Sequence, residues 1–365
     1  MFVPSSKSRR SLLLLFVVSI ALFIWVETSR VFLREKYFSE KLAAAQLMQD
    51  AMKVIKDYRI AQGVFIEELN DPNKTALIGE KETLITTDRG SLTAKLTSLN
   101  PNFAAVIIDQ FKKAKLKKGD KVAFSCTGSF PALNIAVMSA AKVLDLDLIM
   151  ISSVGASMFG ATNQDFTWLD MESVLNENGI FQYKSVATSI GGGRDLGRGL
   201  NKLGRDLIIA AAERNAIPII QENTLEQNIL SKMGIFSSKG KIKLYVNVGG
   251  GLSSLGNAIN GRLVKPGFHR YINLKNIPLK GTMFLFADIG VPVIHILDVI
   301  SIAETYELPI APDPLPKPGD GRVFLDERYN MNIAAIALAI IVILILAVIF
   351  FDHRYLTLKE DEKIM

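Results

Sequence analysis

Two apolar segments, one near each end of the chain, constrain the fold of this protein more than any other feature. Residues 11–26 read SLLLLFVVSIALFIWV, and residues 331–351 read MNIAAIALAIIVILILAVIFF without a single charge. A helix needs roughly 20 apolar residues to cross a membrane. In lipid, a helix satisfies all of its own backbone N–H and C=O groups. We therefore expect a cell-membrane protein that is held in the bilayer at both ends.

The first apolar segment allows two interpretations. Residues 1–10 are basic, as in a secretory signal peptide, but residues 26–29 (VETS) offer no small-x-small cleavage site. We favour an uncleaved signal anchor over residues 11–26. The basic start favours a cytoplasmic N-terminus. This orientation places the central region outside the cytoplasm and returns the tail, residues 352–365, to it.

The composition agrees with a bacterial envelope protein. The single cysteine, Cys126, excludes a disulfide within the chain. The net charge of +6 is mild, and no zinc-ligand spacing, aromatic-basic ladder or arginine-rich tract indicates a nucleic-acid partner. The three histidines, His269, His295 and His353, are too scattered to suggest a metal site, so we expect no metal and no cofactor. The positive charge suits a polyanionic ligand or an acidic membrane surface.

The region between the two apolar segments divides into three parts. Residues 27–70 show apolar side chains at helical spacing, which predicts a juxtamembrane amphipathic helix. Residues 71–308 repeat a strand–turn–helix order, which predicts a three-layer α/β domain with a mainly parallel sheet and Gly-rich strand-to-helix turns. Residues 309–330 begin PIAPDPLPKP, which is typical of an extended linker. The expected strands are Lys121–Phe124, Asp147–Ser152, Tyr183–Ile190, Ala216–Ile220, Ile242–Val248 and Val291–Ile294.

Three turns, each between an expected strand and the helix that follows it, carry the candidate ligand-binding residues. Ligands of open parallel sheets bind at the carboxyl ends of the strands. Glycine lets backbone N–H groups approach an anion, and arginine can bind a carboxylate through two hydrogen bonds. The candidates are Ser125, Cys126, Thr127, Gly128 and Ser129 in the first turn, Gly191, Gly192, Gly193, Arg194, Asp195 and Arg198 in the second, and Gly249, Gly250, Gly251 and Ser253 in the third.

Each turn also has a simpler explanation. The first can be an ordinary helix start with Pro131 in its first turn. The second can be a flexible connection, because its glycine spacing fits neither the dinucleotide fingerprint nor the Walker lysine motif. Asp195 can orient an arginine or act as an acid or base. His295 lies in an apolar stretch typical of a core histidine. Only convergence of the three turns on one sheet edge would make a single anion site.

At these turns the chain resembles the poly-gamma-glutamate system proteins of bacterial capsule and secreted-polymer loci. The residues that carry the resemblance are 124–134 (FSCTGSFPALN), 191–200 and 247–251. The resemblance implies partnership with a poly-γ-glutamate ligase and small membrane subunits of the same system. It supplies neither a reaction nor catalytic residues.

Pattern and resemblance together predict a membrane-anchored accessory protein of poly-γ-glutamate synthesis or export, which binds carboxylate groups of the polymer. Two alternatives stay open. One is a γ-glutamyl hydrolase or transferase in which Ser125, Cys126 or Ser129 attacks the amide bond. The other is a purely structural subunit of the membrane complex, which uses the helix after the first apolar segment to hold its partners.

Overall fold

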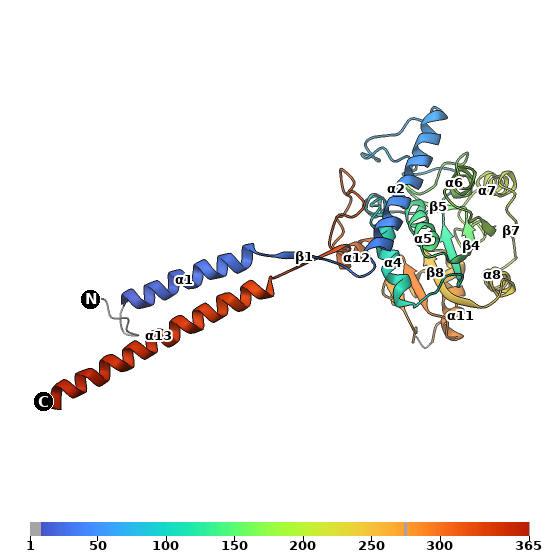
Figure 1. The fold of residues 1–365 in the computed structure, drawn as a ribbon. Helices are drawn as coiled ribbons and strands as arrows, with labels where there is room; N and C mark the ends of the chain where they lie inside the picture. Colours follow the sequence, from blue (N-terminus) through green and yellow to red (C-terminus); the bar gives the residue numbers. More distant parts are fainter. Residues whose placement is uncertain (1–8, 274–275, 365) are drawn as a thin grey trace. The chain divides into compact units, whose positions relative to one another are not determined.

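The computed structural model describes residues 9–273 and 276–364 of the chain (Figure 1). The chain folds into two compact units. Residues 36–324 form the larger one, and the two ends of the chain together form the other.

The terminal unit consists of two long helices joined by a two-stranded ribbon. Helix α1 (Arg9–Thr28) and the first part of helix α13 (Met331–Ile364) are long and apolar enough to cross a membrane, as expected. Strand β1 (Val31–Arg34) pairs antiparallel with strand β11 (Leu325–Arg328). Arg30 strengthens the junction, because it forms ion pairs with Glu27 and Glu327. The ribbon thus ties the inner ends of the two apolar helices together.

The amphipathic helix expected from residue 27 onward is interrupted. Helix α1 ends at Thr28, β1 follows, and α2 (Phe38–Ala61) begins only after Tyr37. Tyr37 has a left-handed backbone with φ of 62°, a conformation that the interior of a helix does not contain. Pairing with β11 satisfies the backbone of β1 from the far end of the chain. Periodicity cannot detect such a partner, and tertiary context overrides local helix propensity.

A seven-stranded sheet forms the centre of the larger unit, in the order β7-β6-β4-β3-β8-β10-β9. All neighbours are parallel except β10 and β9. The prediction of a mainly parallel sheet is therefore confirmed, and each expected strand overlaps an observed one. The strands are β3 (Lys121–Thr127), β4 (Asp147–Ser153), β6 (Ser185–Ser189), β7 (Ile219–Ile220), β8 (Ile242–Val248), β9 (Gly267–His269) and β10 (Val293–Ile296).

Helices cover both faces of this sheet, which confirms the expected three layers (Figure 1). On one face, α2 packs with α4, α5 and α6. On the other, α8 and α11 bury Phe236 and Phe286 against Ala123 of β3 and Tyr245 of β8. Alternate side chains of a strand point to opposite faces, so β3 is buried on both. The helices of this unit are α2, α3 (Leu92–Ser98), α4 (Phe103–Lys113), α5 (Pro131–Val143), α6 (Trp168–Glu177), α7 (Lys202–Arg214), α8 (Leu225–Ser238), α9 (Leu252–Leu255), α10 (Ala258–Leu263), α11 (Thr282–Asp288) and α12 (Val299–Thr305).

The proline-rich segment packs on the larger unit instead of forming a free linker. Asn73 donates a hydrogen bond of 2.8 Å to the carbonyl of Pro312 and accepts one of 3.0 Å from the backbone N–H of Leu315. The Thr97 hydroxyl accepts a bond of 2.9 Å from the N–H of Ala311. A proline-rich backbone makes few hydrogen bonds of its own, so polar side chains from distant segments hold this one in place.

Candidate functional site

The order of the strands places a topological switch point between β3 and β8. The chain proceeds from β3 to β4 on one side of β3 and returns at β8 on the other side. Loops that leave the carboxyl ends of two such strands diverge and open a crevice between them, which is where open α/β sheets bind ligands. The first and third predicted turns are the loops that follow β3 and β8, and therefore border this crevice.

A pocket of about 950 Å³ occupies the crevice. Loops after β3, β4, β6, β8 and β10 contribute to it, together with the segment around α3 and the segment from α9 to β9. All three predicted turns take part, so the structure brings them to one edge of the sheet. The predicted residues that line the pocket are Thr127, Ser129, Gly192, Gly193, Arg198, Gly250 and Gly251.

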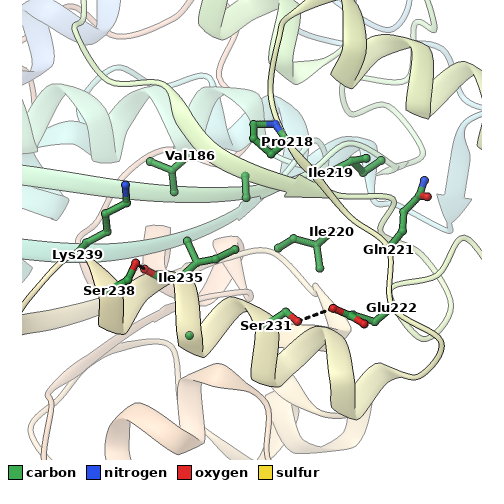
Figure 2. Close-up of a pocket in the computed structure, with 12 residues that line it drawn as sticks. Val186, Pro218, Ile219, Ile220, Gln221, Glu222, Ser231, Ile235, Ser238 and Lys239 are labelled. Atoms are coloured by element: carbon green, nitrogen blue, oxygen red, sulfur yellow. Dashed lines mark hydrogen bonds between the residues drawn. The ribbon is translucent and has the colours of Figure 1, made fainter.

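A second cavity, of about 770 Å³, lies beside helix α8 and the short strand β7 (Figure 2). Its walls are mainly apolar, from Val186, Ile219, Ile220 and Ile235. Two of its lining residues are joined by a hydrogen bond of 2.7 Å, which the Ser231 hydroxyl donates to the Glu222 carboxylate. None of the predicted site residues lines this cavity.

Ser125 and Cys126 of the first turn lie in strand β3 and not in the pocket. Both are buried, and the Cys126 side chain is only 3% exposed. Burial raises the pKa of the Cys126 thiol well above its ordinary value, so the nucleophilic thiolate does not form near neutral pH. Its burial and raised pKa therefore disfavour Cys126 as the nucleophile.

Several predicted glycines shape the pocket through close backbone approach. Gly249 has a φ of 90°, and a Cβ atom there would lie 2.5 Å from the hydroxyl of Thr127. The first and third turns can therefore meet only while residue 249 is glycine. The backbone N–H groups of Gly250 and Gly251 donate to no other group in the described part of the chain, which leaves them available to a ligand. Gly128 and Gly191 do not line the pocket; they pack closely against Val154 and Ser153, in the segment at the end of β4.

The second turn is a closed loop and not a flexible connection. Gly193 and Arg198 exchange backbone hydrogen bonds of 3.2 and 3.1 Å across it. Arg194 and Asp195 at its tip both have left-handed backbones. Arg194 is exposed and does not line the pocket, whereas Arg198 does. Of the two predicted arginines, only Arg198 is thus placed to contact a ligand there.

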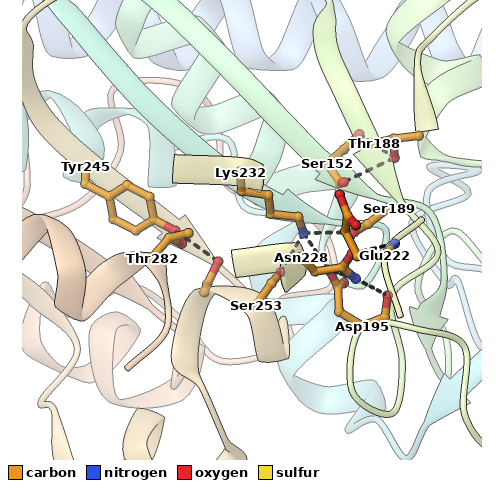
Figure 3. A network of polar contacts seen from close by, with 11 residues as sticks. Ser152, Thr188, Ser189, Asp195, Glu222, Asn228, Lys232, Tyr245, Ser253 and Thr282 are labelled. Carbon is orange, nitrogen blue, oxygen red and sulfur yellow. Dashed lines mark hydrogen bonds and ion pairs between the residues drawn. The ribbon is translucent and has the colours of Figure 1, made fainter. Parts of the chain in front are cut away.

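Asp195 turns inward to a buried lysine (Figure 3). Its carboxylate lies 2.8 Å from Lys232 Nζ of helix α8, and their side chains are 1% and 4% exposed. Lys232 also donates to the hydroxyls of Ser189 and Ser253, at 2.8 and 2.5 Å. Asn228 adds a bond of 3.1 Å to the Asp195 carbonyl. This network joins β6, the second turn and the third turn, so Asp195 and Ser253 hold the pocket walls together and do not face a ligand.

A further wall of the pocket comes from residues 87–95. Strand β2 (Thr86–Asp88) pairs in parallel with strand β5 (Ala156–Ser157), which follows β4. The Thr87 hydroxyl donates 3.1 Å to the carbonyl of Ala156. This pairing sets helix α3 beside the first turn.

Helix α3 brings Lys95 into the pocket wall. The residue is 2% exposed, lines the pocket, and donates to the carbonyl of Ser129 and, at 2.9 Å, to the hydroxyl of Ser157. Its ammonium lies 3.8 Å from the ring centroid of Phe130. No carboxylate forms an ion pair with it within the described ranges. Burial lowers the pKa of Lys95 to about 7. A lysine on a short polar helix gives no sequence signal for this role.

The pocket has an excess of positive charge. Four exposed basic residues line it, and none of them forms an ion pair with a described residue. They are Arg89, Arg198, Arg262 and Lys265. Among the described residues, Asp88 and Asp298 are the acidic ones that line it. Asp298 also accepts a bond of 3.1 Å from the Ser301 N–H at the start of α12. Arg89, Arg262 and Lys265 share no local sequence motif, so pattern alone does not predict that they meet at one pocket.

His295 is a buried, neutral histidine at the base of the pocket. Its Nδ1 lies 3.1 Å from the side-chain amide of Asn247, and its Nε2 lies 3.1 Å from the carbonyl of Gly261. Burial lowers the pKa of His295 to about 4. An amide N–H donated to Nδ1 leaves Nε2–H to donate to the carbonyl. His295 thereby fixes helix α10, which carries Arg262, in agreement with the expected structural histidine.

No group of three or more His, Cys, Asp or Glu side chains in the described ranges could hold a metal ion. Comparison of the chain with protein families, characterised proteins and solved structures finds no match. The fold and the pocket alone therefore define the class: an α/β domain with a cationic pocket at its topological switch point, in a chain with two apolar terminal helices.

Proposed function

We propose that this protein is a membrane-anchored receptor for a polymer that carries carboxylates, namely poly-γ-glutamate, and serves its synthesis or export. One observation carries the proposal: four exposed basic side chains without ion-pair partners among the described residues surround one pocket at the switch point. The resemblance of the three turns supports the choice of polymer. A poly-γ-glutamate ligase and small membrane subunits are the partners that this function implies.

The chemistry of the pocket suits a row of carboxylates. An arginine such as Arg198 or Arg262 can bind one carboxylate through two parallel hydrogen bonds. The backbone N–H groups of Gly250 and Gly251 can donate hydrogen bonds to the oxygens of another carboxylate. A chain of γ-linked glutamates presents one carboxylate per residue, so neighbouring basic groups can be satisfied at once. Because these side chains are exposed, dissolved salt should weaken binding.

We further propose that both ends of the chain cross the membrane and that residues 36–324 lie outside the cytoplasm. The antiparallel pairing of β1 with β11 supports this topology, because it joins the inner ends of α1 and α13. Two spanning helices that meet at such a ribbon leave both termini on the same side. The basic N-terminus favours the cytoplasm as that side.

Titration of the full-length protein in detergent micelles with an oligo-γ-glutamate tests the function. Each of Arg198→Gln and Arg262→Gln should weaken binding roughly ten- to a hundredfold, since a charge-assisted hydrogen bond contributes about 1.5–3 kcal/mol. The matched control is Arg194→Gln, in the same loop as Arg198 but off the pocket, which should bind normally. An amidated oligomer of the same length should not bind.

Two results would contradict the proposal. If the wild-type protein binds neither oligomer, the pocket does not recognise carboxylates and the purely structural subunit takes its place. If Arg194→Gln weakens binding as much as Arg198→Gln, binding follows net charge and not the pocket.

A further inference from the structure

We propose that Ser157 and Lys95 form a nucleophile and general-base pair, and that the pocket cleaves an acyl bond of its ligand. The bond would be the amide of a γ-glutamyl chain, and this choice of substrate rests on the proposed function. The pair itself rests on the geometry of the pocket wall.

The two side chains come from different segments and meet inside the pocket. Lys95 Nζ lies 2.9 Å from the Ser157 hydroxyl, and both residues line the cavity. A nucleophile must stand within hydrogen-bond reach of its base and be open to the substrate. Ser157 is partly exposed, whereas Lys95 is buried behind it. The Ser157 hydroxyl thus lies between the open space of the cavity and the buried amine of Lys95.

The surrounding contacts hold this geometry. Ser157 pairs with Asp88 in the β2–β5 ladder, and its backbone N–H donates 3.0 Å to the hydroxyl of Ser129. Lys95 is fixed on its other side by the carbonyl of Ser129 and by the ring of Phe130. Ser129, a nucleophile candidate from the sequence, is therefore placed as a positioning residue. Preorganised contacts of this kind are what a catalytic pair needs.

The surroundings also favour the neutral amine that a base requires. The ring face of Phe130 favours the cation to some degree, and Asp88 and Arg89 face the same cavity with opposite charges. No described carboxylate pairs with the amine, and burial sets the direction of the shift, which lowers the pKa of Lys95 to about 7. A catalytic base works best with a pKa near the operating pH.

The reaction balances with water as the second substrate. The Ser157 oxygen attacks the carbonyl carbon of the amide, and its proton passes to Lys95 Nζ. The carbon–nitrogen bond then breaks, and the departing amine takes that proton, which leaves an ester on Ser157. Water attacks this ester and gives a proton to Lys95, the carbon–oxygen bond breaks, and the proton returns to Ser157. Basic side chains in the same pocket favour the negative oxygen of each tetrahedral intermediate electrostatically.

Two probes that do not depend on the polymer test the pair in the full-length, detergent-solubilised protein. A fluorophosphonate should label Ser157, located by mass spectrometry of the peptides, and p-nitrophenyl acetate should be hydrolysed. Ser157→Ala should abolish labelling, and Lys95→Met should lower both rates at least a hundredfold. Matched controls are Ser231→Ala in the second cavity and Lys53→Met on α2, which should react as the wild type does.

Further variants keep the outcome clear. If Lys95→Met fails to fold, Lys95→Gln keeps a neutral hydrogen-bond donor toward Ser129 and Ser157 but provides no base, and it should melt near the wild-type temperature while remaining unreactive. A label on Ser129, a label elsewhere, or no label would overturn the pair. Binding of oligo-γ-glutamate to Ser157→Ala is measured separately. If Ser157 is labelled but the oligomer does not bind, the pair stands and the proposed polymer is wrong.

Discussion

Two lysines of this protein are almost equally buried and have opposite surroundings. Lys95 is 2% exposed and Lys232 is 3% exposed. Lys232 meets the carboxylate of Asp195 and two serine hydroxyls. Lys95 meets a carbonyl, one hydroxyl and an aromatic ring, with no carboxylate partner among the described residues. The ion pair between Lys232 and Asp195 joins segments in the interior, whereas the amine of Lys95, which has no such partner, borders the pocket.

The difference shows how burial and function can be separated. A buried charge that is paired and hydrogen-bonded holds a structure in one arrangement, and loss of its partner is costly. A buried ionisable group without a counter-charge is pushed toward its neutral form, and such groups gather at functional sites. Lys232 is thus assigned to the architecture of the pocket and Lys95 to its chemistry.

The largest effect on stability is expected when the ion pair between Asp195 and Lys232 is broken. Asp195→Asn should reduce the free energy of unfolding by about 3–5 kcal/mol, because it leaves Lys232 buried without a counter-charge. Adding Lys232→Met should recover most of that loss. Denaturant unfolding of the full-length protein in detergent, followed by tryptophan fluorescence, measures both. The exposed pair Lys280–Asp288 is the control, and Asp288→Asn should change stability by roughly 0–1 kcal/mol. Equal losses at the two pairs would erase the proposed distinction.

A smaller effect is expected from Lys95 as the pH changes. Its pKa is about 7 in the folded protein against an ordinary 10.5, so the unfolded chain binds more protons between these values. Stability from this residue should therefore rise with pH, by about 2–3 kcal/mol between pH 7 and 9. Lys95→Met should remove this rise. Unfolding of both proteins at pH 7, 8 and 9 measures the difference. Parallel pH profiles would show that the pKa of Lys95 is not lowered in the folded protein.

Most other shifted groups act outside that pH interval, except Cys126, whose ordinary pKa of about 8.5 lies inside it and whose pKa in the folded protein is raised by burial. Burial raises the pKa of Glu172 to about 7 and lowers that of His295 to about 4, so both act on stability below pH 7, with opposite signs. Burial raises the pKa of Tyr183 to about 12, which places its effect above the ordinary tyrosine value near 10. These contributions are common to the wild type and Lys95→Met, so the difference between the two pH profiles reports on Lys95.

Much of the architecture could be predicted from local pattern. The expected strand Ile242–Val248 has the observed bounds of β8, because a run of buried residues there ends at three glycines. The glycine turns also met at one edge, since parallel strands end on the same side. Residues 252–263 form two short helices, α9 and α10, and not one longer helix, because Gly256 has a φ of 81° between them.

The chemistry of the pocket depends on contacts that local pattern does not contain. Lys95 and Ser157 lie far apart in the chain and meet only through the pairing of β2 with β5. Asp195 looked like a ligand or acid–base residue in its glycine loop, and its partner Lys232 lies on a helix that follows the next strand. The roles of such groups follow from burial and partners, which are properties of the folded chain.

Competitive labelling of lysine amines with acetic anhydride tests the central claim most directly. In the full-length protein, read by mass spectrometry across pH 5 to 11, Lys95 should become reactive with a midpoint near pH 7, and oligo-γ-glutamate should protect it. Because its ion pair with Asp57 raises the pKa of Lys53, this exposed lysine should titrate above the ordinary lysine value of about 10.4, and it should stay unprotected. A Lys95 midpoint near that of Lys53, with no protection by the oligomer, would contradict both its neutral state and its place in a ligand pocket.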